Sequence, residues 1–182
     1  MSFKYTNHAA RILLIAMSIV SIPAHAIVSV GVKGGASFVK WAQDPGSGTY
    51  SHKAGIMGGL GLKTMGPIGL LVDVLYAQRS PSNTKTSNIY IPVQMNFGVG
   101  PLMLTAGGFY QMGLSLQVAG ASVDFASSTV AKTDYGVVAG IGFKLMSLSL
   151  EARYNIGFAD LDTTSTYKTN SRSMDFLVGY WF

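Results

Sequence analysis

The last nine residues of the chain alternate between two kinds of side chain, and this constrains the fold more than any other feature. One set is entirely apolar: Met174, Phe176, Val178, Tyr180 and Phe182. The other set is mixed and includes a carboxylate: Asp175, Leu177, Gly179 and Trp181. Successive side chains of a β-strand point to opposite faces, so a period of two indicates a strand whose faces have different surroundings.

The first 26 residues have the three parts of a secretory signal peptide. Residues 1–11 are polar and carry Lys4 and Arg11, residues 12–22 are apolar, and Ala24-His25-Ala26 has the small-x-small form of a cleavage site. The apolar stretch is shorter than the roughly 20 residues that a membrane-spanning helix needs. We therefore predict that residues 1–26 are removed and that residues 27–182 form a single mature domain.

The composition is that of a membrane protein without a spanning helix. Charged residues make up 12% of the chain, about half of the roughly 25% found in soluble domains. No apolar run after residue 26 approaches the length of a spanning helix, and a closed β-barrel is the other structure that leaves no backbone group unpaired in lipid. The chain has no cysteine, which excludes disulfides and thiolate metal sites. Its net charge of +5 is too small to predict nucleic-acid binding.

Alternation continues through the predicted mature chain, which divides into eight segments. In residues 148–158, for example, every second residue counted from Leu148 is apolar, whereas the positions between them include Glu151 and Arg153. Segments of about 10 residues are long enough to cross the apolar band of an outer membrane as tilted strands. The predicted fold is an all-β, eight-stranded antiparallel up-and-down transmembrane β-barrel. Its strands are residues 28–41, 53–63, 68–79, 88–97, 102–117, 134–144, 148–158 and 174–182.

The connections between these segments alternate between short and long. The short ones are residues 64–67, 98–101 and 146–147, and the long ones, rich in Ser, Thr, Asn and Gly, are 42–52, 80–87, 118–133 and 161–171. Outer-membrane barrels have short periplasmic turns and longer outer loops. We therefore expect four surface loops and both mature termini in the periplasm. Aromatic residues in or beside the loops are candidate surface-contact groups: Trp41, Tyr50, Phe125 and Tyr167.

A period of two does not decide whether the apolar face points inward or outward. A polar face in contact with water carries about 25–35% charged residues, whereas here that face is mostly Gly, Ser, Gln and Asn with isolated charges. Eight strands enclose little more than their inward side chains, which small and polar groups would fill. We therefore predict that the apolar face contacts lipid, with an aromatic girdle near each end. The girdles are Phe97, Phe143, Tyr180 and Phe182 at the short-turn end, and Tyr76, Tyr110, Tyr135 and Phe158 at the loop end.

Seven charged side chains share the phase of the polar face and are therefore predicted to lie in the lumen. A lipid-facing Lys or Arg at mid-membrane costs roughly 2–4 kcal/mol, so this common phase is informative. We expect a paired network that fills the barrel, because an isolated charge in a narrow lumen is costly to desolvate. Glu151 neighbours Arg153, Asp175 on the closing strand is within reach of Arg153, and Lys33 or Arg79 is available to Asp73. The seven residues are Lys33, Asp73, Arg79, Lys144, Glu151, Arg153 and Asp175.

Three segments resemble the small outer-membrane β-barrel proteins of the porin family, which are similar to the OmpX and OmpA barrels. They are residues 88–93 (NIYIPV), 134–143 (DYGVVAGIGF) and 150–157 (LEARYNIG). The resemblance implies a monomer in the bacterial outer membrane, in contact with its lipid and lipopolysaccharide. It also implies that the closing strand carries a signal for the barrel-insertion machinery, formed by Phe176, Val178, Tyr180 and Phe182.

Three functions are compatible with these observations. We expect a structural protein whose filled barrel presents four surface loops. The loops would bind a surface ligand, in adhesion or in support of envelope integrity. The alternative is a small, low-conductance diffusion channel lined by the lumen charges. A lipid A-modifying enzyme would depend on Ser51 and His52, but adjacent side chains of an extended chain point in different directions, so we predict no enzymatic activity. No cofactor or metal is expected, because the sequence has no glycine-rich phosphate loop, metal-ligand cluster or carboxylate pair.

Overall fold

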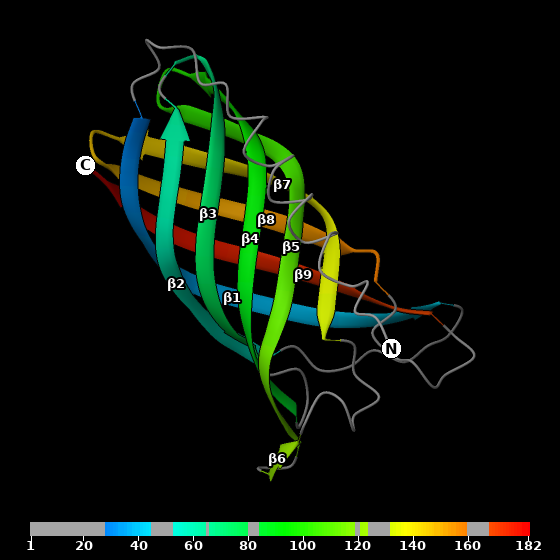
Figure 1. Ribbon diagram of the computed structural model, residues 1–182. Coiled ribbons are helices and arrows are strands. Elements are labelled where there is room, and N and C mark those ends of the chain that lie inside the picture. Colours follow the sequence, from blue (N-terminus) through cyan, green and yellow to red (C-terminus); the bar gives the residue numbers. More distant parts are fainter. Residues whose placement is uncertain are drawn as a thin grey trace, which may run out of the picture.

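The chain folds into a closed barrel of eight antiparallel β-strands with a short ninth strand beside one of them (Figure 1). The computed structural model describes residues 28–44, 53–64, 66–79, 84–118, 121–123, 132–159 and 168–182. None of these residues belongs to a helix long and apolar enough to cross a membrane. The strands are β1 (Val28–Asp44), β2 (Lys53–Thr64), β3 (Ile68–Arg79), β4 (Thr84–Val99), β5 (Leu102–Val118), β6 (Ala121–Val123), β7 (Thr133–Leu145), β8 (Leu148–Gly157) and β9 (Lys168–Trp181).

Several predictions concern residues outside these ranges. The predicted signal peptide, residues 1–26, lies outside the described residues, and so do Ser51 and His52. The same holds for the loop aromatic residues Tyr50, Phe125 and Tyr167.

The barrel closes because its first and last strands pair. β1 pairs with β2 on one side and with β9 on the other, in a register that runs from Gly31 opposite Trp181 to Asp44 opposite Lys168. The other barrel strands pair with their neighbours in chain order, and β5 pairs with both β4 and β7. Closure supplies backbone hydrogen-bond partners on both sides of every barrel strand, which lipid requires. The prediction of an eight-stranded antiparallel up-and-down barrel is confirmed.

Three tight connections and the end of β9 lie at one end of the barrel, which we call the short-turn end. The connections follow β2, β4 and β7, and the opposite end is called the loop end (Figure 1). The turn between β2 and β3 contacts β4, since the Gly98 N–H donates to the Pro67 carbonyl at 2.8 Å. Gly66 and Gly100 have φ of 140° and 61°, values that glycine adopts without the steric cost of a Cβ.

The predicted strand bounds are the same as the observed ones for β3 and are too short for most of the others. β1 continues to Asp44, β4 begins at Thr84 and β9 begins at Lys168. These additions lie at the loop end and are rich in polar residues, so they lack the apolar alternation on which the prediction relied. The backbone ladder continues there because hydrogen bonding between strands does not require apolar side chains.

One segment predicted as loop contains a strand. β6 lies within the predicted connection of residues 118–133 and pairs with the end of β5, with Val118 opposite Ala121. Only two residues separate these partners, which is the length of the shortest β-hairpin connections. The short spacing therefore lets the chain reverse before it continues to β7.

The barrel exterior is apolar, and the alternation has the predicted phase. Along β7, Ile141 is 55% exposed whereas Val138 is 2% exposed. All eight residues predicted for the aromatic girdles are exposed. Tyr110 and Tyr135 are register partners toward the loop end, and Tyr180 pairs with Leu148 toward the short-turn end. A continuous apolar band around a closed barrel indicates a surface in contact with lipid.

The interior contains more apolar side chains than the sequence indicated. Small and polar residues fill it only in part, because the side chains of a narrow, filled lumen pack like a protein core. Tyr90 and Phe109 contact each other there, with their ring centroids 5.4 Å apart. The complete apolar cluster is Met57, Leu75, Ala77, Tyr90, Phe109, Val138 and Leu177.

Candidate functional site in the barrel lumen

Four charged side chains from three strands form one network in the lumen, which we call the lumen charge network: Lys33, Asp73, Glu151 and Arg153. The Lys33 ammonium on β1 lies 3.1 Å from Asp73 Oδ2 on β3 and 2.8 Å from Glu151 Oε1 on β8. Arg153 Nη2, also on β8, donates to Asp73 Oδ2 at 2.6 Å. Arg153 Nε donates to Glu151 Oε2 at 3.1 Å, and its Nη2 contacts the same carboxylate. The network thus links opposite parts of the barrel wall with two positive and two negative charges.

The lumen charge network is sealed from water. The side chains of Lys33, Asp73 and Arg153 are 0% exposed and that of Glu151 is 2% exposed. Buried charges repay their desolvation only when they are paired and hydrogen-bonded. All four groups are paired, but Asp73 Oδ1 and Arg153 Nη1 have no hydrogen-bond partner among the described residues. A continuous water path through this layer would expose the side chains that line it, so the barrel is closed here.

A second polar cluster lies nearer the loop end and is centred on Asp175 of β9. Its Oδ1 accepts a 2.5 Å hydrogen bond from the Ser37 hydroxyl, and its Oδ2 accepts one of 2.6 Å from Asn155 Nδ2. Arg79 Nη2 lies 3.7 Å from the same Oδ2. The Tyr90 hydroxyl donates to Asn155 Oδ1 at 2.6 Å, which ties this cluster to the apolar layer.

The structure brings most of the predicted lumen residues together, but with some different partners. Glu151 contacts Arg153, and Asp73 contacts Lys33, as proposed from the sequence. The ion pairs of the described residues do not include Arg153 with Asp175, although the two are register partners. The long Arg153 side chain instead reaches across the lumen to Asp73. Lys144 is half-buried, lies near the short-turn end and belongs to neither cluster.

Three buried residues contribute to the lumen although they were not among the seven candidates. The Trp181 indole lies under two ammonium groups, with Lys63 Nζ 3.8 Å and Lys33 Nζ 4.9 Å from the ring centroid. Its Nε1 donates to the Ser149 hydroxyl at 2.9 Å. Asp134 is buried at the loop end, where it accepts hydrogen bonds from Ser171 and from the backbone of Ala159. Lys63, Asp134 and Trp181 all lie in the inward phase, so the alternation was the signal that could have found them.

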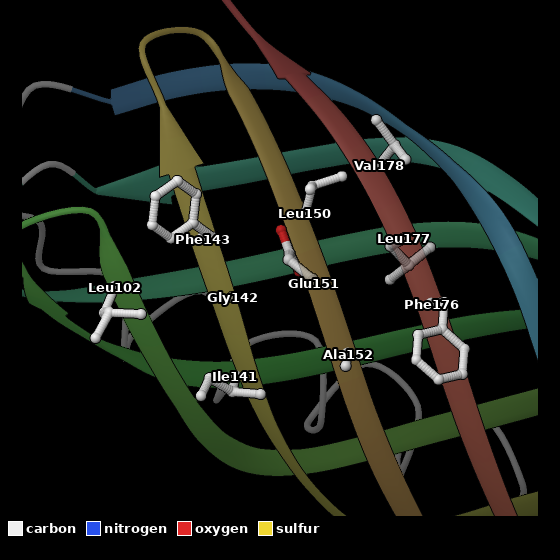
Figure 2. A pocket seen from close by; sticks show the side chains of 10 residues that line it. All are labelled: Leu102, Ile141, Gly142, Phe143, Leu150, Glu151, Ala152, Phe176, Leu177 and Val178. Carbon is white, nitrogen blue, oxygen red and sulfur yellow. The ribbon is translucent and has the colours of Figure 1, made fainter.

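The outer wall carries a shallow apolar groove over β5, β7, β8 and β9. Its volume is about 460 Å³. Figure 2 shows the side chains that line it. Its floor includes the small residues Gly142 and Ala152, and exposed Phe143, Leu150 and Phe176 stand around it. Glu151 also borders the groove, but its carboxylate belongs to the lumen charge network. The groove has the chemistry of a contact for lipid hydrocarbon.

The four residues of the predicted insertion signal lie on the outer face of β9. Phe176, Val178, Tyr180 and Phe182 are exposed, by 46%, 53%, 46% and 76%. Phe182 is held at the end of the strand because its N–H donates to the Val30 carbonyl at 2.8 Å. Elsewhere among the described residues, no group of three or more acidic, His or Cys side chains is placed to hold a metal ion.

A closed antiparallel barrel with an apolar exterior, aromatic girdles and a charged, filled lumen has the fold of the small bacterial outer-membrane β-barrels. Comparison with solved structures agrees. The chain is similar to neisserial surface protein A (NspA), with a TM-score of 0.58 and 17% identity over 84% of this chain and 97% of that one. It is also similar to Ail, the attachment invasion locus protein of Yersinia pestis, in complex with the heparin analogue sucrose octasulfate, with a TM-score of 0.50 and 14% identity over 85% and 99% of the two chains. No protein-family model matches the sequence, and no curated protein matches it significantly.

Proposed function

We propose that this protein is a non-conducting outer-membrane barrel that acts as a rigid scaffold for surface loops. The observation that carries the proposal is the sealed lumen charge network, in which Lys33, Asp73 and Arg153 have fully buried side chains. A pore must keep a hydrated path along its axis, whereas a scaffold gains rigidity from a filled interior. The proposed role of this scaffold is in adhesion or envelope integrity. Ail, named for attachment and invasion, supports that role through a shared fold only.

The proposal includes an orientation and a set of partners. The short-turn end and both mature termini face the periplasm, and four loops face outward, since short turns mark the periplasmic side of such barrels. The apolar band contacts outer-membrane lipid and lipopolysaccharide, and the loops contact a surface ligand. The outward residues of β9 serve the insertion machinery, and the protein works as a monomer without enzymatic activity.

Single-channel recording in planar bilayers tests the closed lumen. We expect the purified protein to insert without producing stable conductance steps. The variants Glu151→Ala and Arg153→Ala remove members of the lumen charge network. Arg172→Ala is the matched control, because Arg172 is an exposed residue of β9.

A stable, ion-selective step in the unmodified protein would favour the diffusion channel instead. A change in the conductance or ion selectivity of that step in Glu151→Ala or Arg153→Ala, but not in Arg172→Ala, would show that the ions pass the lumen charge network. Insertion is verified separately, by protease protection of the protein in lipid vesicles. A failure to insert is then not mistaken for a closed lumen.

A further inference from the structure

A polar cavity lies at the short-turn end of the lumen, outside the lumen charge network. Its volume is about 200 Å³, and it is bordered by β2, β4, β5, β7 and the turns between them. Lys63 of β2 and Lys144 of β7 both line it. Thr64 and Asn96 add a hydroxyl and an amide, and the remaining wall is formed by Gly66, Gly98, Gly100, Leu102 and Met103.

The charges around this cavity are unbalanced. Within the described part of the chain, neither Lys63 nor Lys144 takes part in an ion pair. The lumen carboxylate of Glu151 contacts Lys33 and Arg153 instead. The sequence around the short turns supplies no Asp or Glu side chain: residues 28–32, 60–70, 95–105, 141–149 and 178–182 contain none. Two lysine residues therefore line one cavity to which no described Asp or Glu side chain contributes.

The neighbouring side chains hold Lys63 at the cavity. Its ammonium rests 3.8 Å from the centroid of the Trp181 ring, and the indole itself is fixed by a hydrogen bond to Ser149. Lys63 is 5% exposed, so the cation–π contact replaces only part of the hydration that burial removes. Asn96 is 8% exposed, and its Oδ1 has no hydrogen-bond partner among the described residues. This amide oxygen is an acceptor, so it calls for a donor at the cavity wall, which a water molecule or the P–OH group of hydrogen phosphate can supply.

We propose that this cavity binds a phosphate group, with Lys63 and Lys144 as its charged ligands. The oxygens of one phosphate group can accept hydrogen bonds from both lysines, in inorganic phosphate and in a phosphodiester headgroup alike, whereas chloride offers a single centre. Lysine is a common phosphate ligand. The Thr64 hydroxyl oxygen accepts from the Leu70 N–H at 2.8 Å, and a hydroxyl that accepts one hydrogen bond keeps its own hydrogen to donate.

The phosphate could come from solution or from a phospholipid headgroup. The exposed aromatic residues Phe143 and Tyr180 lie near this end of the barrel, and such residues mark the level of the headgroups. The cavity therefore opens near a membrane surface, where both sources are present.

Fluorescence of Trp181 provides the test, because this indole contacts Lys63. The chain has two tryptophans, so Trp41→Phe leaves Trp181 as the sole reporter. The folded protein in dodecyldimethylamine-oxide micelles, which contain no phosphorus, is titrated with inorganic phosphate and separately with dihexanoyl phosphatidylglycerol. Potassium chloride keeps the ionic strength constant, and calorimetry repeats each titration without relying on the indole.

We expect a saturable signal in the unmodified protein. The dissociation constant should rise about tenfold or more in Lys63→Gln and in Lys144→Gln, which corresponds to the loss of one hydrogen bond to a charged group. Lys85→Gln removes the same charge from an exposed residue of β4 near the loop end and should leave binding unchanged. Heat-modified migration on gels shows that each variant is folded. If Lys63→Gln does not fold, half-buried Lys144 still provides the test.

Saturation by inorganic phosphate alone identifies free phosphate as a source, and saturation only by the lipid identifies the headgroup. Either result supports the site. The proposal is overturned if chloride at the same ionic strength reproduces the signal, if neither titrant saturates, or if Lys144→Gln binds as the unmodified protein does.

Discussion

Arg153 of β8 donates a 2.6 Å hydrogen bond to Asp73 of β3, a residue 80 positions earlier in the chain and on another part of the barrel wall. Lys33 of β1 contacts the same Asp73 oxygen. Side chains from three strands thus meet at one carboxylate, and the barrel wall is connected through its interior as well as along its backbone ladders. Such a network stabilises the barrel only while all of its members are present.

Arg153→Ala is expected to lower the free energy of unfolding by about 3–5 kcal/mol, because it leaves the Asp73 and Glu151 carboxylates buried and removes one of the two cations that contact them. Urea titration in lipid vesicles measures this loss. Arg172→Ala, which removes an exposed arginine from β9, should change stability by less than about 0.5 kcal/mol. Equal effects of the two substitutions would show that the network contributes little.

Tyr90→Phe removes one hydroxyl from the lumen and leaves Asn155 Oδ1 without its 2.6 Å donor. We expect a loss of about 1–3 kcal/mol in the free energy of unfolding, the cost of a buried polar atom without a partner. Tyr110→Phe is the matched control, since Tyr110 is 47% exposed on the outer face. A larger effect at Tyr110 than at Tyr90 would mean that the inward and outward phases are reversed.

Ile141→Lys introduces a charge on the outer face near the middle of β7, where Ile141 is 55% exposed. We expect it to cost about 2–4 kcal/mol in the free energy of folding into vesicles, and Leu145→Lys at the end of the same strand to cost about 0–1 kcal/mol. This depth dependence distinguishes lipid from water as the surroundings of the outer face. If both substitutions were neutral, the apolar band would not be in contact with hydrocarbon.

Gly61→Ala tests the packing of Trp181 within the barrel. A Cβ at Gly61 would lie 2.5 Å from Asp73 Oδ1 and 3.0 Å from the Trp181 ring, whereas the nearest atom to a Cβ at Gly34 is the Met57 carbonyl oxygen at 3.8 Å. We expect Gly61→Ala to lower stability by about 1–3 kcal/mol and Gly34→Ala to change it by less than about 0.5 kcal/mol. The near-ultraviolet circular dichroism of the tryptophans should change only in Gly61→Ala. Identical behaviour of both variants would argue against a closely packed indole.

Phe182→Ser tests the proposed insertion signal. We expect less protein in the outer membrane of cells, while refolding of the purified protein in detergent remains unchanged, because Phe182 is 76% exposed and contributes little packing. Val99→Ser, at a residue that is 73% exposed near the same end of the barrel, controls for the loss of apolar surface. A comparable loss in both variants would indicate a general effect of hydrophobicity.

The fold could be predicted from the sequence because strand alternation and loop length are local properties. The alternation assigned Asp73 and Arg153 to the lumen, and the same signal was present for Lys63 and Trp181. Ion-pair partners were harder to predict, since phase gives the direction of a side chain but not its distance from residues on the opposite wall. Arg153 therefore extends past its register partner Asp175 to Asp73. The loop-end extensions of β1, β4 and β9 were missed because their polar residues do not alternate with apolar ones.

The pairing of β1 with β9 joins Gly31 to Trp181, near opposite ends of the predicted mature chain. Contacts between residues so distant in sequence form slowly, since the entropy of closing a long loop must be overcome first. The seam cannot form until translation has delivered the final strand, and a truncated product would retain an open edge. The barrel wall therefore stays open along β1 until the last strand is in place.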